Sequence, residues 1–112
     1  MMRALFIDPG RLRNELSLEA CVPVADEIGG YQETWTEIAT VFGMIEPVSA
    51  TSVFGAGQPL ETTTHRITIR HRSGVESGMR LRRQDRVFEI ITVHDPDDSG
   101  RYLMCRVRET GA

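Results

Sequence analysis

Few side chains in this sequence combine a reactive type with the spacing that catalysis or metal binding requires. His65 and His71 lie six residues apart on one face of a predicted strand, and His94 ends another. A catalytic zinc ion typically needs three neighbouring protein ligands. Because a strand rises about 3.3 Å per residue, the first two histidines would lie about 20 Å apart. We therefore expect no metal site and no cofactor.

The segment at residues 95–100 is similar to the beginning of an EF-hand calcium loop. An EF-hand needs a bidentate glutamate at the twelfth position of the loop, and Arg106 occupies that position here. The aspartates, proline, serine and glycine of this segment favour a hairpin turn instead.

The two cysteines, Cys21 and Cys105, lie far apart, with no CxxC motif and no neighbouring histidine. A nucleophilic cysteine needs an adjacent base and a cleft, whereas Cys105 shares an apolar strand face with Leu103 and Val107, where a thiol packs as a small apolar group. We see no secretory signal, so two reduced structural thiols are favoured over a disulfide. Phosphate-binding glycine loops and the GxSxG motif are absent. We therefore expect that the chain is not an enzyme.

Charge is distributed unevenly along the chain. All 13 basic residues are arginine; residues 1–63 hold 3 of them against 9 acids, and residues 64–112 hold 10 against 7 acids. Codon usage is the simpler explanation for the absence of lysine. An acidic half and a basic half nevertheless suit self-association or docking on charged partners.

Alternate residues of the predicted strands in the second half place several arginines on one face. They are Arg66, Arg70, Arg80, Arg82, Arg106 and Arg108. Such a patch contacts nucleic-acid phosphates, or it pairs bidentately with carboxylates from the acidic half of a neighbouring copy. The net charge of −3 and the lack of interleaved aromatics disfavour a module that stacks bases. We favour pairing between copies.

Short strands must position these side chains. Five apolar residues recur at every second position over residues 16–24, which predicts a half-buried strand with one apolar face. The paired glycines at 29–30 predict a hairpin turn. Further alternating runs cover residues 64–72, 79–82, 87–94 and 102–108. Turn signals at this spacing predict an all-β fold, a small antiparallel β-barrel or sandwich of about six to seven strands.

Residues 31–48 predict one long strand or two consecutive strands with apolar side chains on both faces. Val41 and Ile45 share one face, and Phe42 and Met44 share the other. Such a strand is central in the core or half-covered by a neighbouring subunit. Trp35 is expected to be a core or interface anchor.

The length of 112 residues predicts a single domain. We divide it into an N-terminal arm (1–14), a barrel (15–109) and a C-terminal tail (110–112). Within the barrel, the connection at residues 49–63 is longer than usual, so it is either functional or disordered; residues 51–54 are compatible with a short helix. No apolar run approaches the roughly 20 residues of a membrane helix, so no membrane partner is expected.

Five segments, in this order, carry a family resemblance: DPGRLR (8–13), GGYQETW (29–35), ATVFGMIEP (39–47), THRITIR (64–70) and RVFEI (86–90). Over about residues 8–109 the chain resembles the head–tail joining proteins of tailed phages, the small connector family that includes the stopper. Gly43 stands where that family often has a larger residue, and the lysine-free composition is unusual for it.

The resemblance implies a β-barrel that assembles as a homo-oligomeric ring of six or twelve copies in the neck of a virion or phage-like particle, built in the bacterial cytoplasm. Its implied partners are the portal or adaptor proteins on one side and the tail or tail-terminator proteins on the other. Double-stranded DNA would pass through the ring, or be held back by it, without sequence specificity. The alternative interpretation is an OB-like barrel that binds nucleic acid.

Two groups of residues are expected to carry this function. The long connection would reach the channel axis or a partner with Ser49, Ala50, Thr51, Ser52, Val53, Phe54, Gly55, Ala56, Gly57, Gln58 and Pro59. The candidates for the interface between subunits are Trp35, Phe42, Met44, Arg66, Arg70, Arg80 and Arg82. Gating by such a ring would use loop position rather than catalysis.

Overall fold

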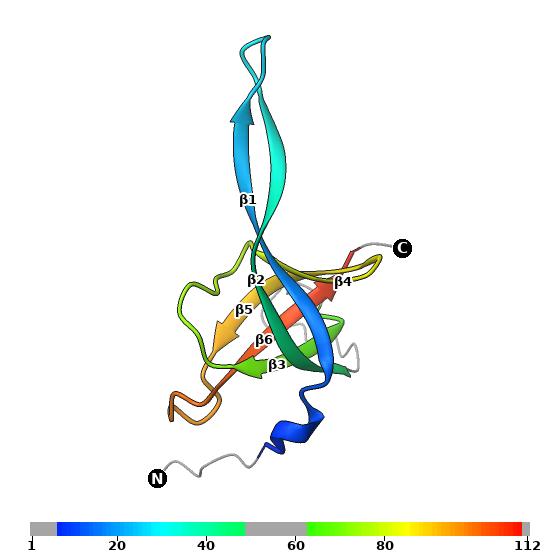
Figure 1. Ribbon diagram of the computed structural model, residues 1–112, viewed down its shortest axis with the longest axis vertical. Helices are drawn as coiled ribbons and strands as arrows, with labels where there is room; N and C mark the ends of the chain where they lie inside the picture. The colour runs from blue at the N-terminus through cyan, green and yellow to red at the C-terminus, as the bar shows by residue number, and fades with distance from the viewer. Residues whose placement is uncertain (1–6, 49–62, 111–112) are drawn as a thin grey trace, which may run out of the picture.

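The computed structural model describes residues 7–48 and 63–110. It is an all-β fold in which six antiparallel strands close into a barrel in the order β1-β2-β3-β6-β5-β4 (Figure 1). The elements are η1 (Pro9–Arg11), β1 (Asn14–Ala25), β2 (Tyr31–Pro47), β3 (His65–Arg70), β4 (Arg80–Arg83), β5 (Arg86–His94) and β6 (Tyr102–Glu109). The described residues include no helix of the length and apolarity that a membrane crossing requires.

The barrel core is built from alternate residues of the strands, as the period of two in the sequence predicts. Its fully or nearly fully buried members are Leu16, Leu18, Ile67, Ile69, Leu81, Phe88, Ile90, Leu103, Cys105 and Val107. Val41 and Ile45 pack against this cluster from β2. Cys105 therefore lies among apolar side chains, and both cysteines are free thiols.

Turns follow the local chemistry of the sequence. Asp95 organises the turn before β6: its Oδ1 accepts a hydrogen bond from the Asp97 amide (3.2 Å), and its Oδ2 accepts one from the Gly100 amide (2.7 Å). This carboxylate thus mimics a backbone turn. Asp98 and Gly100 adopt positive φ values of 57° and 76°. The segment is a hairpin turn, as expected.

Gly43 is buried on the face of β2 that points into the core. A Cβ atom here would lie 3.0 Å from Ile67 Cγ2, 3.0 Å from Leu16 Cδ1 and 3.1 Å from the Thr68 carbonyl oxygen. Neighbouring side chains already fill this volume. The close packing explains why a glycine stands at this position of β2.

Replacing Gly43 with valine is expected to lower the free energy of unfolding by about 1–3 kcal/mol, the usual cost of overpacking a filled core. Urea unfolding followed by circular dichroism measures the change. Thr36→Val is the matched control, because Thr36 is exposed on the same strand. Equal unfolding midpoints for the two variants would contradict the tight packing at Gly43.

β1 and β2 extend beyond the barrel as a two-stranded projection (Figure 1). Their pairing continues to Ala25 and Tyr31, whereas β4 pairs with β1 only as far as Glu19. A β-bulge between Leu18 and Glu19 marks the point of departure. We call residues 20–38 the projecting hairpin.

The projecting hairpin corrects one expectation. The alternation over residues 16–24 predicted a single half-buried face, and Leu16 and Leu18 are indeed buried. Val22 and Val24, however, are 46% and 49% exposed. The reason is that the short β4 limits the height of the barrel wall, so no core lies behind the outer part of β1.

Candidate assembly surface

Most of the large apolar side chains that the described part of the chain exposes lie on the projecting hairpin. They are Val22, Val24, Ile28, Tyr31 and Ile38, with Phe42 further along β2. Ile28 at the turn is 91% exposed and Tyr31 is 74% exposed. A two-stranded hairpin has little stability of its own, and grouped exposed apolar residues mark interaction sites. This geometry favours a hairpin that is covered by a partner.

The two faces of the hairpin differ in composition. Cross-strand partners share a face, so Val22 and Thr34 lie together with Val24 and Gln32 on one side. On the other side, partners are Cys21 and Trp35, Pro23 and Glu33, and Ala25 and Tyr31. The first face is apolar along β1 and polar along β2; the second combines aromatic rings with a carboxylate.

An ion pair and an aromatic ring fix the base of the hairpin to the barrel. Arg80 Nε on β4 lies 2.5 Å from Glu19 Oε1 on β1, and both side chains are largely buried. The Arg80 guanidinium also lies over the Trp35 ring, 4.1 Å from its centroid, which is a cation–π geometry. Two of the interface candidates, Trp35 and Arg80, therefore contact each other within one chain, at the base of the hairpin.

The hairpin is acidic, because residues 20–38 contain four aspartates and glutamates and no arginine, lysine or histidine. Asp26 has a structural role, because its Oδ1 accepts hydrogen bonds from the amides of Ile28 (3.0 Å) and Gly30 (2.8 Å). Glu27 and Glu33, in contrast, are exposed carboxylates on either side of that turn. The distal hairpin thus combines apolar side chains with negative charge.

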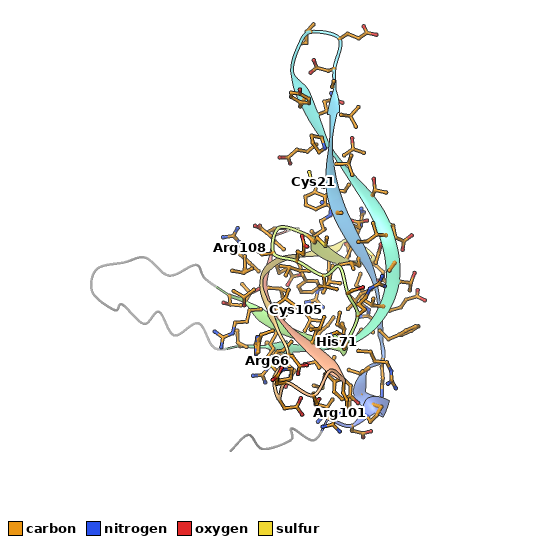
Figure 2. All side chains as sticks on the ribbon, turned by 90° about the vertical axis from the view of Figure 1, so that its left-hand side faces the viewer. Cys21, Arg66, His71, Arg101, Cys105 and Arg108 are labelled. Carbon is orange, nitrogen blue, oxygen red and sulfur yellow. The ribbon has the colours of Figure 1, made fainter. Side chains whose placement is uncertain are left out.

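Many arginines of the barrel wall pair with carboxylates of the same chain. Arg66 binds Glu46 from the first half of the sequence (3.3 Å), as Arg80 binds Glu19. The other pairs are Arg86 with Glu109 (2.9 Å), Arg101 with Asp97 (3.0 Å) and Arg108 with Glu89 (2.9 Å). Figure 2 shows Arg108, Arg66 and Arg101 at different levels along the barrel. Acids therefore interleave with the arginines that the sequence suggested as one basic patch.

Arg70 and Arg82, the remaining arginine candidates, are exposed. Arg82 Nε donates to the Gln84 carbonyl oxygen (2.9 Å). Within residues 7–48 and 63–110, neither forms an ion pair with an acid. These two side chains carry positive charge that the described part of the chain does not neutralise by a direct contact.

A groove with a basic edge lies between η1, β2 and the end of β3. We call it the basic groove; its volume is about 420 Å³, and its lining is Pro9, Leu12, Thr40, Val41, Phe42, Arg70, His71 and Arg72. The Asp8 side chain caps η1 by accepting a hydrogen bond from the Gly10 amide (3.0 Å). A second groove of about 400 Å³ contains the carboxylates Glu15 and Glu37 beside its arginines. The basic groove has no carboxylate in its lining.

Phe42 and Met44 occupy the outward face of β2, as the two-faced pattern predicts. Phe42 is 52% exposed and lines the basic groove. Met44 is half-buried opposite Thr68, whose hydroxyl is buried and has no hydrogen-bond partner. The sequence suggested that this strand is either central in the core or half-covered by a neighbouring subunit. Phe42 is not buried within the single chain, so its coverage by a neighbouring subunit stays a prediction.

The histidines and cysteines do not form a reactive cluster. His65 packs edge-on against Phe88, with 5.3 Å between ring centroids, and His71 is exposed beyond the end of β3. In the described ranges, no three His, Cys, Asp or Glu residues lie close enough to hold a metal ion. Cys21 lies on the projecting hairpin, and Cys105 lies inside the barrel (Figure 2).

A thiol reagent such as iodoacetamide is expected to modify Cys21 and spare Cys105 in the native protein. Burial raises the pKa of Cys105 to about 12, and only the thiolate reacts. Cys21 is half-buried and reachable. Peptide mass spectrometry measures the modification, and denatured protein, in which both residues react, is the control. Equal native reactivity of the two would contradict the buried position of Cys105.

The predicted channel loop, Ser49 to Pro59, and the short helix expected within it lie outside the described residues. The ends of this connection are defined, however. The Val48 amide donates to the Thr64 carbonyl oxygen (3.0 Å), and the Thr64 amide donates to the Val107 carbonyl oxygen (2.9 Å). These bonds attach both ends of the connection to the barrel.

The sequence-based candidates include neither the exposed apolar residues of the hairpin nor the η1 edge of the groove. The hairpin residues that they miss are Val22, Val24, Ile28, Tyr31 and Ile38. One signal in the sequence does point to the hairpin. The apolar runs on both sides of residues 26–30 are longer than the run at residues 79–82, which pairs with the first of them. A short strand cannot cover a long neighbour, so part of the hairpin must lie beyond the barrel.

Comparisons with known proteins agree with this geometry. The family model described as phage head completion protein matches residues 7–110. A chain of the virion of a native gene transfer agent particle is 27% identical, with a TM-score of 0.67, and the match covers 89% of this chain and 96% of that one. The solution structure of protein SF1141 from Shigella flexneri 2a is 28% identical, with a TM-score of 0.69 and coverage of 92% and 96%. No curated protein matches the chain.

Proposed function

Because this chain belongs to the phage head completion protein family, we propose that it is a head–tail connector that forms a ring between the portal and the tail. Its family makes it a structural component of a virion or phage-like particle. The proposal assigns it a structural rather than a catalytic role. The portal or adaptor proteins would bind one side of the ring, and the tail or tail-terminator proteins would bind the other.

The observation that carries this proposal is the projecting hairpin. Its apolar side chains, including Ile28 and Tyr31, are exposed in the single chain, and a hairpin of this kind gains stability when a partner covers it. A contact between unlike surfaces of identical copies repeats from one copy to the next and closes into a ring when the rotation permits. A connector ring supplies such partners.

The proposal includes passage of double-stranded DNA through the ring without sequence specificity. Exposed arginines such as Arg82 provide the charge for contacts with phosphates, which carry no sequence information. The OB-like alternative requires that the free chain itself bind nucleic acid with a steep dependence on salt concentration. A DNA-binding titration of the purified chain at low salt distinguishes the two functions.

We further propose that residues 49–59 gate the channel or contact a neighbouring ring. Deletion of Ser52 to Pro59 is expected to leave the barrel folded, because the bonds at Val48 and Thr64 hold both ends of the connection. The melting temperature should change little, whereas head–tail joining or DNA retention should be lost. Particle titre and electron microscopy of particles measure these effects.

A Gly/Ser segment of the same length, inserted in place of Ser52 to Pro59, is the control that separates the length of the connection from its side chains. Particles that join tails and retain DNA at the normal level with the deleted chain would refute the role proposed for this segment. If the chain itself never enters particles, the connector function is wrong as a whole.

A further inference from the structure

We infer that the tip of the projecting hairpin inserts into the basic groove of a neighbouring copy of the same chain. The inference rests on the proposed ring and names the surfaces that join its subunits. The hairpin supplies Ile28 with the carboxylates of Glu27 and Glu33, and the groove supplies Phe42 with Arg70 and Arg72.

The two surfaces are complementary in charge. Residues 20–38 contain Asp26, Glu27, Glu33 and Glu37 and no arginine, lysine or histidine, so the hairpin is purely acidic. The groove lining contains two arginines and a histidine and no carboxylate, and Arg70 and Arg72 form no ion pair with an acid of the described residues. The acidic hairpin of one copy and the basic groove of another therefore attract each other, and such complementary charges steer two partners together and fix the register of their contact.

The surfaces are also complementary in apolar content. Ile28 and Tyr31 are the most exposed of the large apolar side chains in the described residues, and both lie at the distal end of the hairpin. The groove offers Leu12 and Phe42 beneath its basic edge, with a volume of about 420 Å³ that suits side chains from a narrow tip. Insertion would remove apolar surface on both partners from water.

A chain cannot fill its own groove. Tyr31 begins β2 beside the hairpin turn, and Phe42 lies eleven residues further along the same strand. At about 3.3 Å per residue the two positions are about 36 Å apart, and Figure 1 shows the hairpin turn and η1 at opposite ends of the molecule. The contact therefore joins two copies. Because its two surfaces differ, it can repeat from one copy to the next, and it closes into a ring when the rotation permits.

Cross-linking in assembled particles tests the contact directly. Glu27→Cys and Arg72→Cys are combined in a Cys21→Ser background and treated with a short bis-maleimide; Cys105 stays inert because it is buried. We expect a ladder of covalent multimers, whereas a reciprocal two-fold contact would stop at the dimer. Each single-cysteine variant is a control that lacks one end of the link and gives no ladder.

Charge reversal tests the same contact without a cross-linker. Glu27→Arg/Glu33→Arg and Arg70→Glu/Arg72→Glu should each lower incorporation into particles about tenfold or more, because like charges then meet. Co-expression of the two variants should restore incorporation, since each hairpin then faces a groove of opposite charge. Thermal melting checks that both variants fold.

The outcomes separate the inference from the proposed function. Particles that contain the wild-type chain but give no hairpin-to-groove ladder overturn the inference and leave the connector function standing. Links from the thiol introduced by Glu27→Cys to another particle protein, in place of a second copy, overturn it as well. Absence of the wild-type chain from particles overturns the connector function itself.

Discussion

Replacing Phe88 with alanine is expected to lower the free energy of unfolding by about 3–5 kcal/mol, the usual cost of removing a buried phenyl ring. Phe88 is the largest fully buried side chain of the described residues. Its ring faces His65 edge-on and receives the Arg86 guanidinium at 4.8 Å from its centroid. Since small domains are stable by only about 5–15 kcal/mol, this single change removes a large part of the total.

Phe42→Ala is the matched control for the Phe88 variant. It deletes the same ring from a position that is 52% exposed, so only about half of the burial term is lost and we expect a change of about 1 kcal/mol. Chemical denaturation of both variants at neutral pH gives the comparison. Similar losses in the two variants would show that the core does not centre on Phe88. Loss of assembly by Phe42→Ala with stability retained would instead match the groove contact.

The alternation of apolar residues was enough to predict the strands and the core. Ile67 and Ile69, for example, are separated by Thr68, and a period of two places them on one face. The structure confirms the all-β barrel, with six strands, and the family match confirms the resemblance to phage connector proteins. These features depend on local patterns and on their order along the chain.

The projecting hairpin could not be predicted from alternation alone. Leu18 and Val22 have the same local pattern, yet Leu18 is buried and Val22 is 46% exposed. Their different burial depends on β4, which lies about sixty residues away in the sequence and pairs with β1 only from Ser17 to Glu19. Burial of a strand residue depends on the length of its neighbours, which a single segment does not encode.

The carboxylates that pair with the arginines could be identified only from the register in which the strands of the barrel pair. Composition predicts that arginines seek carboxylates, and the sequence-based hypothesis placed those carboxylates on a neighbouring copy. The closure of β1 on β4 instead brings Glu19 beside Arg80, and the pairing of β2 with β3 brings Glu46 beside Arg66. These intrachain pairs leave Arg70, Arg72, Arg82 and Arg106 exposed and without an ion pair to an acid of the described residues, and their charge is available for partners.

One ion pair also links stability to pH. The hydrogen bond from Arg86 lowers the pKa of Glu109 below its usual range. A carboxylate with a lowered pKa stabilises the fold above its unfolded pKa of about 4.3, and this contribution disappears as the pH falls through the folded value. The pair joins the start of β5 to the end of β6, so acid weakens the barrel at that seam.

Shortening the projecting hairpin is expected to abolish assembly and leave the barrel intact. The variant removes Val22 to Thr34 and joins Cys21 to Trp35 through an Asn-Gly turn, which favours a tight hairpin. The base formed by Glu19, Arg80 and Trp35 is retained, and the removed residues contribute nothing to the core. Thermal melting should therefore change little.

The size of the assembly defect follows from the apolar surface that the shortened hairpin no longer offers. Full burial of one exposed valine side chain is worth about 1.5–3 kcal/mol. Val22 and Val24 are 46% and 49% exposed in the single chain, so covering both is worth about 1.5–3 kcal/mol in total, or about 10- to 10²-fold in affinity. Val22→Thr/Val24→Thr keeps the length and shape of the hairpin and should show an intermediate loss. Particle titre measures the defect. A shortened chain that supports normal titre would mean that the exposed hairpin has no partner, and the connector ring would then need a different contact between its subunits.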